Sequence, residues 1–345
     1  MAMRVASLGR HLPSSVGASR ALRAARRSCS QGAADAPPRP VHVASWLREH
    51  AASFAPPVMN KLLHRAQLSV MFVGGPNRRE DFHMEPGSEF FYQLRGSMEL
   101  VTVQAGQRRL VPIREGDVYL LPSRIPHSPQ RPEEGSIGLV IERERYAEEP
   151  PDGLRFYTDF ATCDDVLWER YFHCRDLGKD LVPIIAEFNA SEEKATRRPT
   201  DTSVLLEPPL RQDVHTVVPD PFNLDAWLAA NAAALDGGAS LRLFGEHPDR
   251  EFGVLVEGGR AGGSSADGGQ QANEAHRVWA HETFLHQLRG GAVLHIGAER
   301  LRLSEGECVV LPAGLQHRVQ RDAGSRGLVV TNDPKGNAGE THIAH

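Results

Sequence analysis

The sequence is poor in cysteine, in long hydrophobic runs and in excess positive charge. Its four cysteines, Cys29, Cys163, Cys174 and Cys308, include no C-x-x-C pair, so neither a disulfide scaffold nor a cysteine zinc site is indicated. No apolar run approaches the roughly 18 residues of a transmembrane helix. The 39 Lys and Arg are outnumbered by 44 Asp and Glu, which argues against a nucleic-acid binder. We expect a protein of a reducing compartment with no nucleic-acid or membrane partner.

Aromatic residues are also scarce, at 6 %, but hydrophobic residues make up 40 % of the 345 positions. This is enough for packed cores in one large domain or two ordinary ones. Abundant Gly (32) and Pro (24) favour many short strands joined by turns. The expected strands include 68–73, 90–94, 98–103, 118–121 and 137–141. Short helices are expected at 43–50 and around 184–188, the latter with Pro183 in its first turn.

Acidic residues are missing from the N-terminal segment before Asp35, which contains six arginines and several serines. This composition is typical of an organellar transit peptide, and a disordered extension would look the same. We therefore leave residues 1–40 out of the fold prediction.

The second half of the chain repeats the first in order. Residues 287–290 copy 93–96, and 305–312 copy the pattern of 115–122. His317 then falls where His127 does, five residues after a proline. Such ordered self-similarity indicates two copies of one β unit. We assign them to residues 41–196 and 217–345, joined by a Pro-rich linker at 197–216.

Three residues in the first copy have the spacing of a metal site. His83, Glu89 and Gly96 read H-x5-E-x6-G, and Gly116, Pro122 and His127 read G-x5-P-x4-H. Two histidines and one carboxylate from neighbouring strands form a facial triad, which leaves three coordination positions open, as in non-heme Fe(II) oxygenases. Such a metal can hold a substrate and dioxygen together. The same ligands also suit manganese or nickel.

Charged residues alternate just before this motif. In a strand, Arg79, Asp81 and His83 would point to the same face. That face is either the interior of a barrel or a solvated surface, and one strand alone does not separate the two.

The spacing of these motifs resembles that of the cupin superfamily, and several short sequence segments resemble the 3-hydroxyanthranilate 3,4-dioxygenase family. These segments are residues 56–62, 71–77, 91–94 and 120–131, within a resemblance that runs from about residue 41 to the end of the chain. Glu85 replaces the second His of the general cupin motif and Arg131 its terminal Asn, departures that agree with this family. The resemblance implies an all-β fold of two cupin barrels (double-stranded β-helix, or jelly-roll), with a few short helices.

The resemblance also implies a site. It implies Fe(2+) held by His83, Glu89 and His127. The residues implied on the substrate are Glu89, Arg131, Glu142 and, more weakly, Asn60, with Arg79 near dioxygen. The chemistry suits these roles, because a guanidinium such as Arg131 can clamp a carboxylate with two hydrogen bonds. Glu142 can take a proton, Arg79 can stabilise a developing superoxide charge, and Asp81 can orient Arg79 or His83.

The implied reaction is extradiol-type ring opening. It converts 3-hydroxyanthranilate and O2 to 2-amino-3-carboxymuconate semialdehyde, the quinolinate precursor of the kynurenine pathway and pyridine nucleotide biosynthesis. The resemblance places the enzyme in the cytoplasm, whereas the arginine-rich N-terminus leaves the mitochondrion open. Two rival functions remain: another metal cupin acting on a different aromatic acid, and a non-enzymatic bicupin.

The second copy lacks the triad. His83 aligns with Arg277 and Glu89 with Thr283, so only His317 is retained. We expect a metal-free barrel that covers the first in place of a second subunit, and hence a monomer built as a pseudo-dimer. Elsewhere, His286 is expected to be at the surface or hydrogen-bonded. The charged run 142–149, apart from Glu142, is expected to be a solvated loop.

Overall fold

A computed structural model describes residues 38–345, except 55–58, 250, 261–276, 333–339 and 343–345. The predicted N-terminal extension, apart from its last three residues, lies outside the described part. Within these ranges, no helix is both long enough and apolar enough to cross a membrane.

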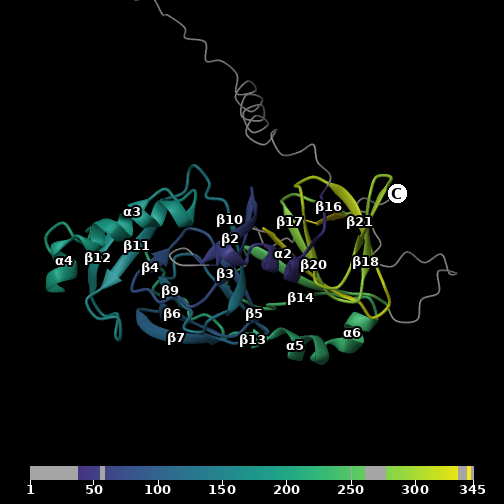
Figure 1. The fold of residues 1–345 in the computed structure, drawn as a ribbon, viewed down its shortest axis with the longest axis horizontal. Coiled ribbons are helices and arrows are strands. Elements are labelled where there is room, and N and C mark those ends of the chain that lie inside the picture. Colours follow the sequence, from purple (N-terminus) through teal and green to yellow (C-terminus); the bar gives the residue numbers. More distant parts are fainter. Residues whose placement is uncertain (1–37, 55–58, 250, 261–276, 333–339, 343–345) are drawn as a thin grey trace, which may run out of the picture. The chain divides into compact units, whose positions relative to one another are not determined.

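The chain forms two β-barrels of one plan (Figure 1), which confirms the predicted all-β fold of two cupin barrels. In the first barrel, one sheet has the order β13-β8-β5-β10-β3-β2 and the other β12-β11-β4-β9-β6-β7. Its own strands are β2 (Asn60–Arg65), β3 (Leu68–Gly74), β4 (Phe82–Met84), β5 (Glu89–Arg95), β6 (Met98–Gln104), β7 (Gln107–Ile113), β8 (Asp117–Leu121), β9 (His127–Gln130), β10 (Ile137–Arg143), β11 (Asp152–Tyr157) and β12 (Val166–Phe172). The five predicted strands match β3, β5, β6, β8 and β10.

The second barrel repeats this plan with sheets β1-β20-β17-β22-β15-β14 and β19-β18-β21-β16-β23. Its own strands are β14 (Ser240–Arg242), β15 (Phe252–Gly258), β16 (Arg277–Trp279), β17 (Thr283–Arg289), β18 (Ala292–Ile296), β19 (Glu299–Leu303), β20 (Glu307–Leu311), β21 (Gln316–Arg321), β22 (Arg326–Asn332) and β23 (Glu340–His342). The registers correspond, because His83 pairs with His127 in the first barrel as Arg277 pairs with His317 in the second.

Each barrel is completed by the chain segment that precedes the other. β1 (Val41–His42) pairs with β20 of the second barrel, and β13 (Phe222–Asn223) pairs with β8 of the first. A helix follows each segment, α2 (Val43–Glu49) and α5 (Leu224–Ala230). The side chains of His42 and Asn223 cap these helices by accepting from the backbone N–H three residues on. The exchange thus ties the barrels together at both sheet edges.

The remaining helices are η1 (Ala51–Ser53), α3 (Leu177–Asn189), α4 (Glu192–Thr196) and α6 (Ala232–Asp236). The expected position of Pro183 was wrong, because it lies inside α3 rather than in its first turn. The helix begins earlier since the Asp180 carboxylate accepts the N–H groups of Arg175 and Asp176, both at 2.7 Å. Phe188 of α3 stacks on Phe156, with ring centroids 3.5 Å apart, and packs the helix onto β11 and β12.

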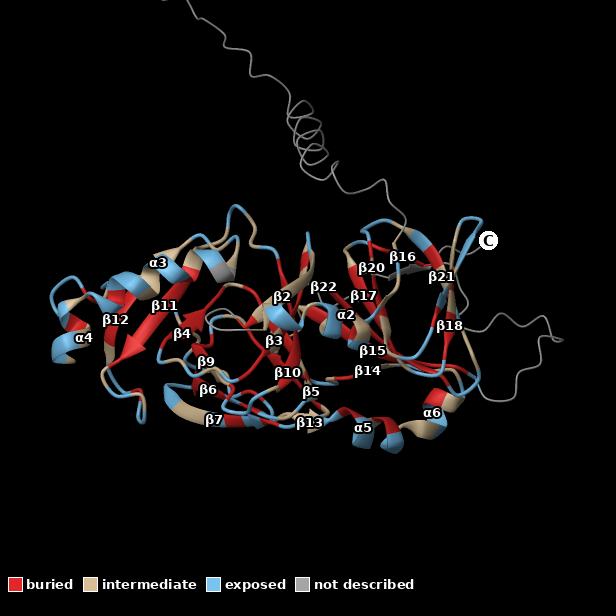
Figure 2. Ribbon diagram, viewed as in Figure 1, coloured by how far each residue is buried: buried red, intermediate tan, exposed pale blue. Residues whose placement is uncertain are grey.

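The largest hydrophobic core is shared by both barrels. It includes Phe72 and Phe90 from the first barrel and Phe284 and Leu328 from the second, all buried. Separate cores fill each barrel interior. Figure 2 shows the buried strands at the centre and exposed surface on α4 and α5. The two barrels are therefore packed on each other through apolar sheet faces.

Candidate metal centre

His83, Glu89 and His127 converge on one point inside the first barrel. His83 lies on β4 and His127 on the neighbouring β9, while Glu89 begins β5. All three are buried, and one ligand atom of each lies within 4.8 Å of those of the other two. Nε2 of His127 lies 2.8 Å from Oε1 of Glu89. Two imidazoles and one carboxylate, so close and so buried, match the donor set of a facial-triad metal site.

Hydrogen bonds prepare both histidines for a metal. Nδ1 of His127 lies 3.0 Å from the carbonyl oxygen of Ile125. A carbonyl only accepts, so Nδ1 carries a hydrogen, and Nε2, which faces Glu89, is the nitrogen on the side of the candidate metal position. Burial lowers the pKa of His83, although its contact with Asp152 acts in the opposite direction. His83 is therefore neutral near pH 7, the form that binds metals.

Arg79 and Asp81 do not lie on one strand with His83 as the alternation suggested, because β4 starts only at Phe82. Gln130 holds the backbone of Arg79 instead, accepting from its N–H at 3.2 Å and donating to its carbonyl at 2.8 Å. The Arg79 side chain donates to Asp81, with Nε 3.0 Å from Oδ2. Asp81 thus orients Arg79, not His83.

A cavity of about 520 Å³ gathers all the residues that the sequence singled out. They are Asn60, Arg79, Asp81, His83, Glu89, His127, Arg131 and Glu142. The rest of the wall combines apolar side chains, among them Val73, Phe91 and Val140, with further polar ones such as Glu80 and Lys194. The cavity thus offers both an apolar wall and converging charged groups to a small ligand.

Arg131 is buried in this cavity, and none of the carboxylates in the described part of the chain pairs with it. Its Nη1 donates to Oε1 of Gln93 at 3.0 Å, and its Nε has no hydrogen-bond partner among the described residues. Burial lowers the pKa of Arg131 to about 10. Its backbone is fixed by paired hydrogen bonds of 2.7 and 2.8 Å with Asn77. A buried cation held this firmly is prepared to receive an anion.

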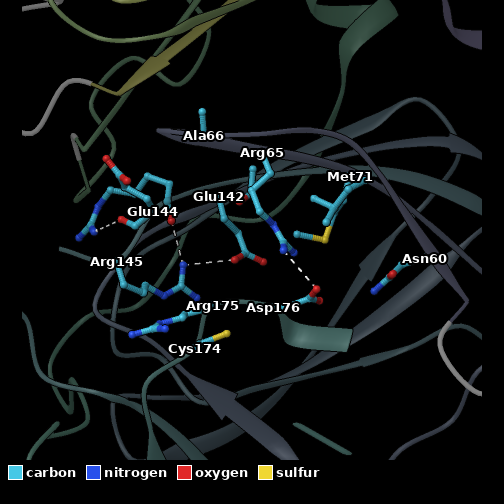
Figure 3. A pocket seen from close by; sticks show the side chains of 13 residues that line it. Asn60, Arg65, Ala66, Met71, Glu142, Glu144, Arg145, Cys174, Arg175 and Asp176 are labelled. Carbon is cyan, nitrogen blue, oxygen red and sulfur yellow. Dashed lines mark hydrogen bonds and ion pairs between the residues drawn. The ribbon is translucent and has the colours of Figure 1, made fainter. Parts of the chain in front are cut away.

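The charged segment, residues 142–149, is only partly the solvated loop that we expected, because Glu144 and Glu148 are exposed but Arg143 and Arg145 turn inward. The Arg145 side chain is only 14 % exposed, and its Nη1 lies 3.2 Å from Oε2 of Glu142 (Figure 3). It also pairs with Glu85 and with Asp152, where Nη2 and Oδ2 are 2.9 Å apart. Burial, with Glu89 and Asp152 nearby, raises the pKa of Glu142 well above its ordinary value. The segment folds inward because Arg145 compensates three buried carboxylates.

Sequence reasoning missed the partner of His83. Oδ2 of Asp152 lies 2.9 Å from Nε2 of His83. Asp152 begins β11, which pairs with β4 so that Leu154 faces His83. No spacing in the sequence identifies this pairing, because β4 and β11 are almost 70 residues apart.

The equivalent place in the second barrel is filled by its own ion pairs. Arg277 stands where His83 does and pairs with Glu257. Glu257 also accepts from Arg321, with Nη2 and Oε2 2.7 Å apart. Thr283, in the place of Glu89, is hydrogen-bonded to Thr331 at 3.2 Å. The second barrel therefore replaces two of the three candidate ligands by groups that serve its own stability.

Comparison with known proteins agrees with this architecture. The family model for 3-hydroxyanthranilic acid dioxygenase matches residues 36–189. The chain is 44 % identical to 3-hydroxyanthranilate 3,4-dioxygenase of Rattus norvegicus and 42 % to that of Homo sapiens, each over 86 % of this chain and 97 % of the relative. Among solved structures, salicylate 1,2-dioxygenase from Pseudaminobacter salicylatoxidans aligns with TM-score 0.53 and 14 % identity, over 94 % of this chain and 95 % of the other.

The last likeness concerns the fold alone, whereas the relatives match the chain at high identity over nearly their whole length. With the cupin barrels and the buried His/Glu cluster in place, the chain belongs to the 3-hydroxyanthranilate 3,4-dioxygenase family of ring-cleaving dioxygenases.

Proposed function

We propose that this protein is an Fe(II)-dependent dioxygenase that opens the ring of 3-hydroxyanthranilate with O2 to give 2-amino-3-carboxymuconate semialdehyde. One observation carries the choice of substrate class: the cavity that contains the triad also contains Arg131, buried and without a carboxylate partner among the described residues. An aromatic acid supplies the missing carboxylate and the ring that suits the apolar wall.

The second barrel supports the role of Arg131. Arg321 donates to Gln287 at 3.0 Å as Arg131 donates to Gln93, so the two arginines are equivalent. Arg321 has the Glu257 carboxylate as its partner. In the first barrel the substrate carboxylate would take that place, with two hydrogen bonds from the planar guanidinium.

His83, Glu89 and His127 are the residues that would hold the metal. Their nitrogen and oxygen donors fit Fe(II), as the family resemblance implies. When bound, the ion would bring the aminophenol and dioxygen together at neighbouring positions. Asp152 would orient His83 through the contact between them, as outer partners of metal-binding histidines do.

Glu142 would accept a proton from the substrate, and Arg79 would stabilise the negative charge that develops on dioxygen. The raised pKa of Glu142 makes its carboxylate a better proton acceptor than an ordinary glutamate, so it can take a proton from the substrate hydroxyl or amine. Arg145 stays beside it as a fixed cation. The Arg79 guanidinium is held by Asp81, on a backbone fixed by Gln130, and offers donors where negative charge develops on dioxygen. Asn60, at the rim shared with a second cavity, would contact the substrate weakly.

The product would place the enzyme before quinolinate in the kynurenine pathway to pyridine nucleotides. We further propose that the protein acts as a monomer, because exchanged strands and a shared core already cover the sheet faces that cupins use to dimerise. A cytoplasmic location follows from the family resemblance, and the arginine-rich N-terminus makes the mitochondrion the alternative. A fluorescent protein fused after residue 40 distinguishes the two compartments.

The test is anaerobic reconstitution with Fe(II), followed by 3-hydroxyanthranilate and air, with the absorbance of the ring-opened product as readout. We expect the product to appear only when iron, substrate and oxygen are all present. Bound iron without product would assign the site to a different aromatic acid. Failure to bind iron would favour a non-enzymatic bicupin.

A further inference from the structure

We infer that the second barrel takes part in catalysis as a positioning domain, through Glu251, which ties together the two strand ends that carry Glu89 and Glu142. Glu251 comes directly before β15 of the second barrel. The inference rests on the proposed function of the first barrel, since it concerns the geometry of that site.

The two oxygens of Glu251 bind different strands of the first barrel. Oε2 accepts the backbone N–H of Ser88 at 2.7 Å, and Oε1 accepts Nε of Arg143. Ser88 is the residue before Glu89, and Arg143 is the residue after Glu142. Ser88 is 1 % exposed and Arg143 2 % exposed, so these bonds are shielded from water. Such shielded, charge-assisted hydrogen bonds are the strong ones.

The bridge lies where the backbone ladder between the two strands stops. β5 and β10 pair from Arg95 and Ile137 down to Phe90 and Ile141. Glu89 and Glu142 lie one residue beyond this last pair, and no backbone pairing joins them. Glu251 therefore supplies a link between the strands at the level of the site, beside the bond that Nη2 of Arg143 donates to the Pro86 carbonyl at 3.3 Å.

The charged segment is held from the same side. Arg143 also binds Glu149, with Nη1 and Oε2 2.7 Å apart, and lies 4.6 Å above the ring of Tyr146. The Tyr146 hydroxyl accepts from Nδ2 of Asn332 in the second barrel at 2.9 Å. The segment thus presents Arg145 to the site and Arg143 and Tyr146 to the second barrel.

A second carboxylate reinforces this anchor. Asp249, two residues before Glu251, accepts from the Ser88 hydroxyl. Ser88 is therefore held at its N–H by Glu251 and at its side chain by Asp249. The second barrel thus has no triad of its own but fixes the spacing of the two acidic groups in the triad and the substrate cavity.

The test is Glu251→Gln in the full-length, iron-loaded protein. An amide has only one acceptor, so either Ser88 N–H or Arg143 Nε would face an NH2 group. We expect kcat/KM per bound iron to fall about ten- to a hundredfold, as misplaced catalytic groups lose rate, with a higher KM for 3-hydroxyanthranilate. Glu251→Asp keeps the charge and both acceptors and should recover part of the loss.

The matched control is Glu282→Gln. Glu282 also links the barrels, accepting from Leu68 N–H at 2.8 Å and lying 3.0 Å from Nε2 of His64, but it touches neither strand end. The melting temperature should fall by a similar amount in both Gln variants. Only Glu251→Gln should change KM and the kcat per bound iron. Asp249→Asn gives a milder second variant if Glu251→Gln fails to fold.

Three outcomes are distinguishable. Unchanged kinetics in Glu251→Gln, or equal losses in Glu251→Gln and Glu282→Gln, would overturn the positioning role, because a merely structural contact predicts either. The expected split between the two variants would support it. An inactive wild-type protein would instead contradict the proposed function, and with it the basis of this inference.

Discussion

Val73 and Glu257 occupy the same position in the two barrels. Val73 pairs with Gly138 on β10, and Glu257 pairs with Gly327 on β22. Each glycine in turn faces a glutamine, Gln93 or Gln287, that accepts from the arginine of its barrel. Only the second barrel has a carboxylate in this row. One side chain thus makes the difference between the barrels. Glu257 neutralises Arg321 in the second barrel, whereas Val73 leaves Arg131 available to a ligand in the first.

The first prediction concerns Arg131. Arg131→Gln should keep iron but raise KM for 3-hydroxyanthranilate by about a hundredfold or more, since a bidentate charged contact is worth roughly 3 kcal/mol. Steady-state kinetics and iron analysis check both parts. Arg321→Gln is the matched control: it should lower the melting temperature without moving KM. An unchanged KM in Arg131→Gln would exclude Arg131 as the carboxylate clamp.

A single methyl group at Gly138 should have a similar effect. A Cβ there would lie 2.7 Å from both Nη2 of Arg131 and Oε1 of Gln93, closer than side chains pack. Gly138→Ala should therefore push the guanidinium aside and raise KM by about tenfold, for a loss on the order of 1.4 kcal/mol. The change leaves the triad untouched, so iron content should stay at the wild-type level. Loss of iron would mean that the strand, rather than the arginine, had moved.

Metal binding should depend on the histidines of the first barrel and not on His317, the histidine at the equivalent position in the second. His83→Ala should abolish stoichiometric Fe(II) binding, because two donors do not form a closed facial site. His317 has the same backbone contact as His127, with Nδ1 3.0 Å from the Leu315 carbonyl, but its neighbour is Arg277. His317→Ala should therefore bind one iron per chain, as the wild type does. Iron analysis after desalting measures both, and full iron content in His83→Ala would contradict the ligand assignment.

Acid should weaken the second barrel through His286. Burial lowers the pKa of His286 from 6.5 to about 4. The unfolded chain binds the proton first, so the free energy of unfolding is full above pH 6.5. It should fall by on the order of 3 kcal/mol as the pH drops to about 4. Urea unfolding at several pH values measures this.

His286→Leu should show a flatter pH dependence than the wild type between pH 6.5 and 4. Its control is His295→Leu, which removes a half-buried ring that lies 3.2 Å from Oε1 of Gln320. The control should follow the wild-type profile. Parallel profiles for wild type and His286→Leu would show that His286 does not titrate in this range on unfolding.

The location of His286 also shows what the sequence could not predict. We expected it to be exposed or hydrogen-bonded, yet it is 7 % exposed and its Nδ1 has no hydrogen-bond partner among the described residues. It follows Phe284 with a period of two on β17, and that face packs between the barrels. Alternation shows which residues share a face, but it does not show which face another domain will cover.

The convergence of His83, Glu89 and His127 could be predicted because its evidence is local. His83 and Glu89 are six residues apart, and Gly116 and Pro122 precede His127 at the expected spacing. The partners of the site depend on distant pairing instead, as with Asp152 on His83 and Glu251 on Arg143. Arg145 lies in a run of alternating charges, a pattern that predicts an exposed segment. It is buried in the structure because it forms ion pairs with three buried carboxylates. Charge alone therefore predicts exposure poorly where several opposite charges can be buried together.

The reciprocal strand exchange has a consequence for the history and engineering of the chain. Val41–His42 and Phe222–Asn223 each sit in the sheet of the other half, so the halves are interlocked as well as fused. A cut between the two barrels, in the predicted linker at 197–216, should leave two complementary fragments that hold each other, as separate subunits would. Deleting the half without the triad would instead expose an apolar face and an unpaired strand edge. Substitutions at the triad positions of the second barrel, where Arg277 and Thr283 stand, leave this interlock intact, whereas loss of the whole barrel would break it.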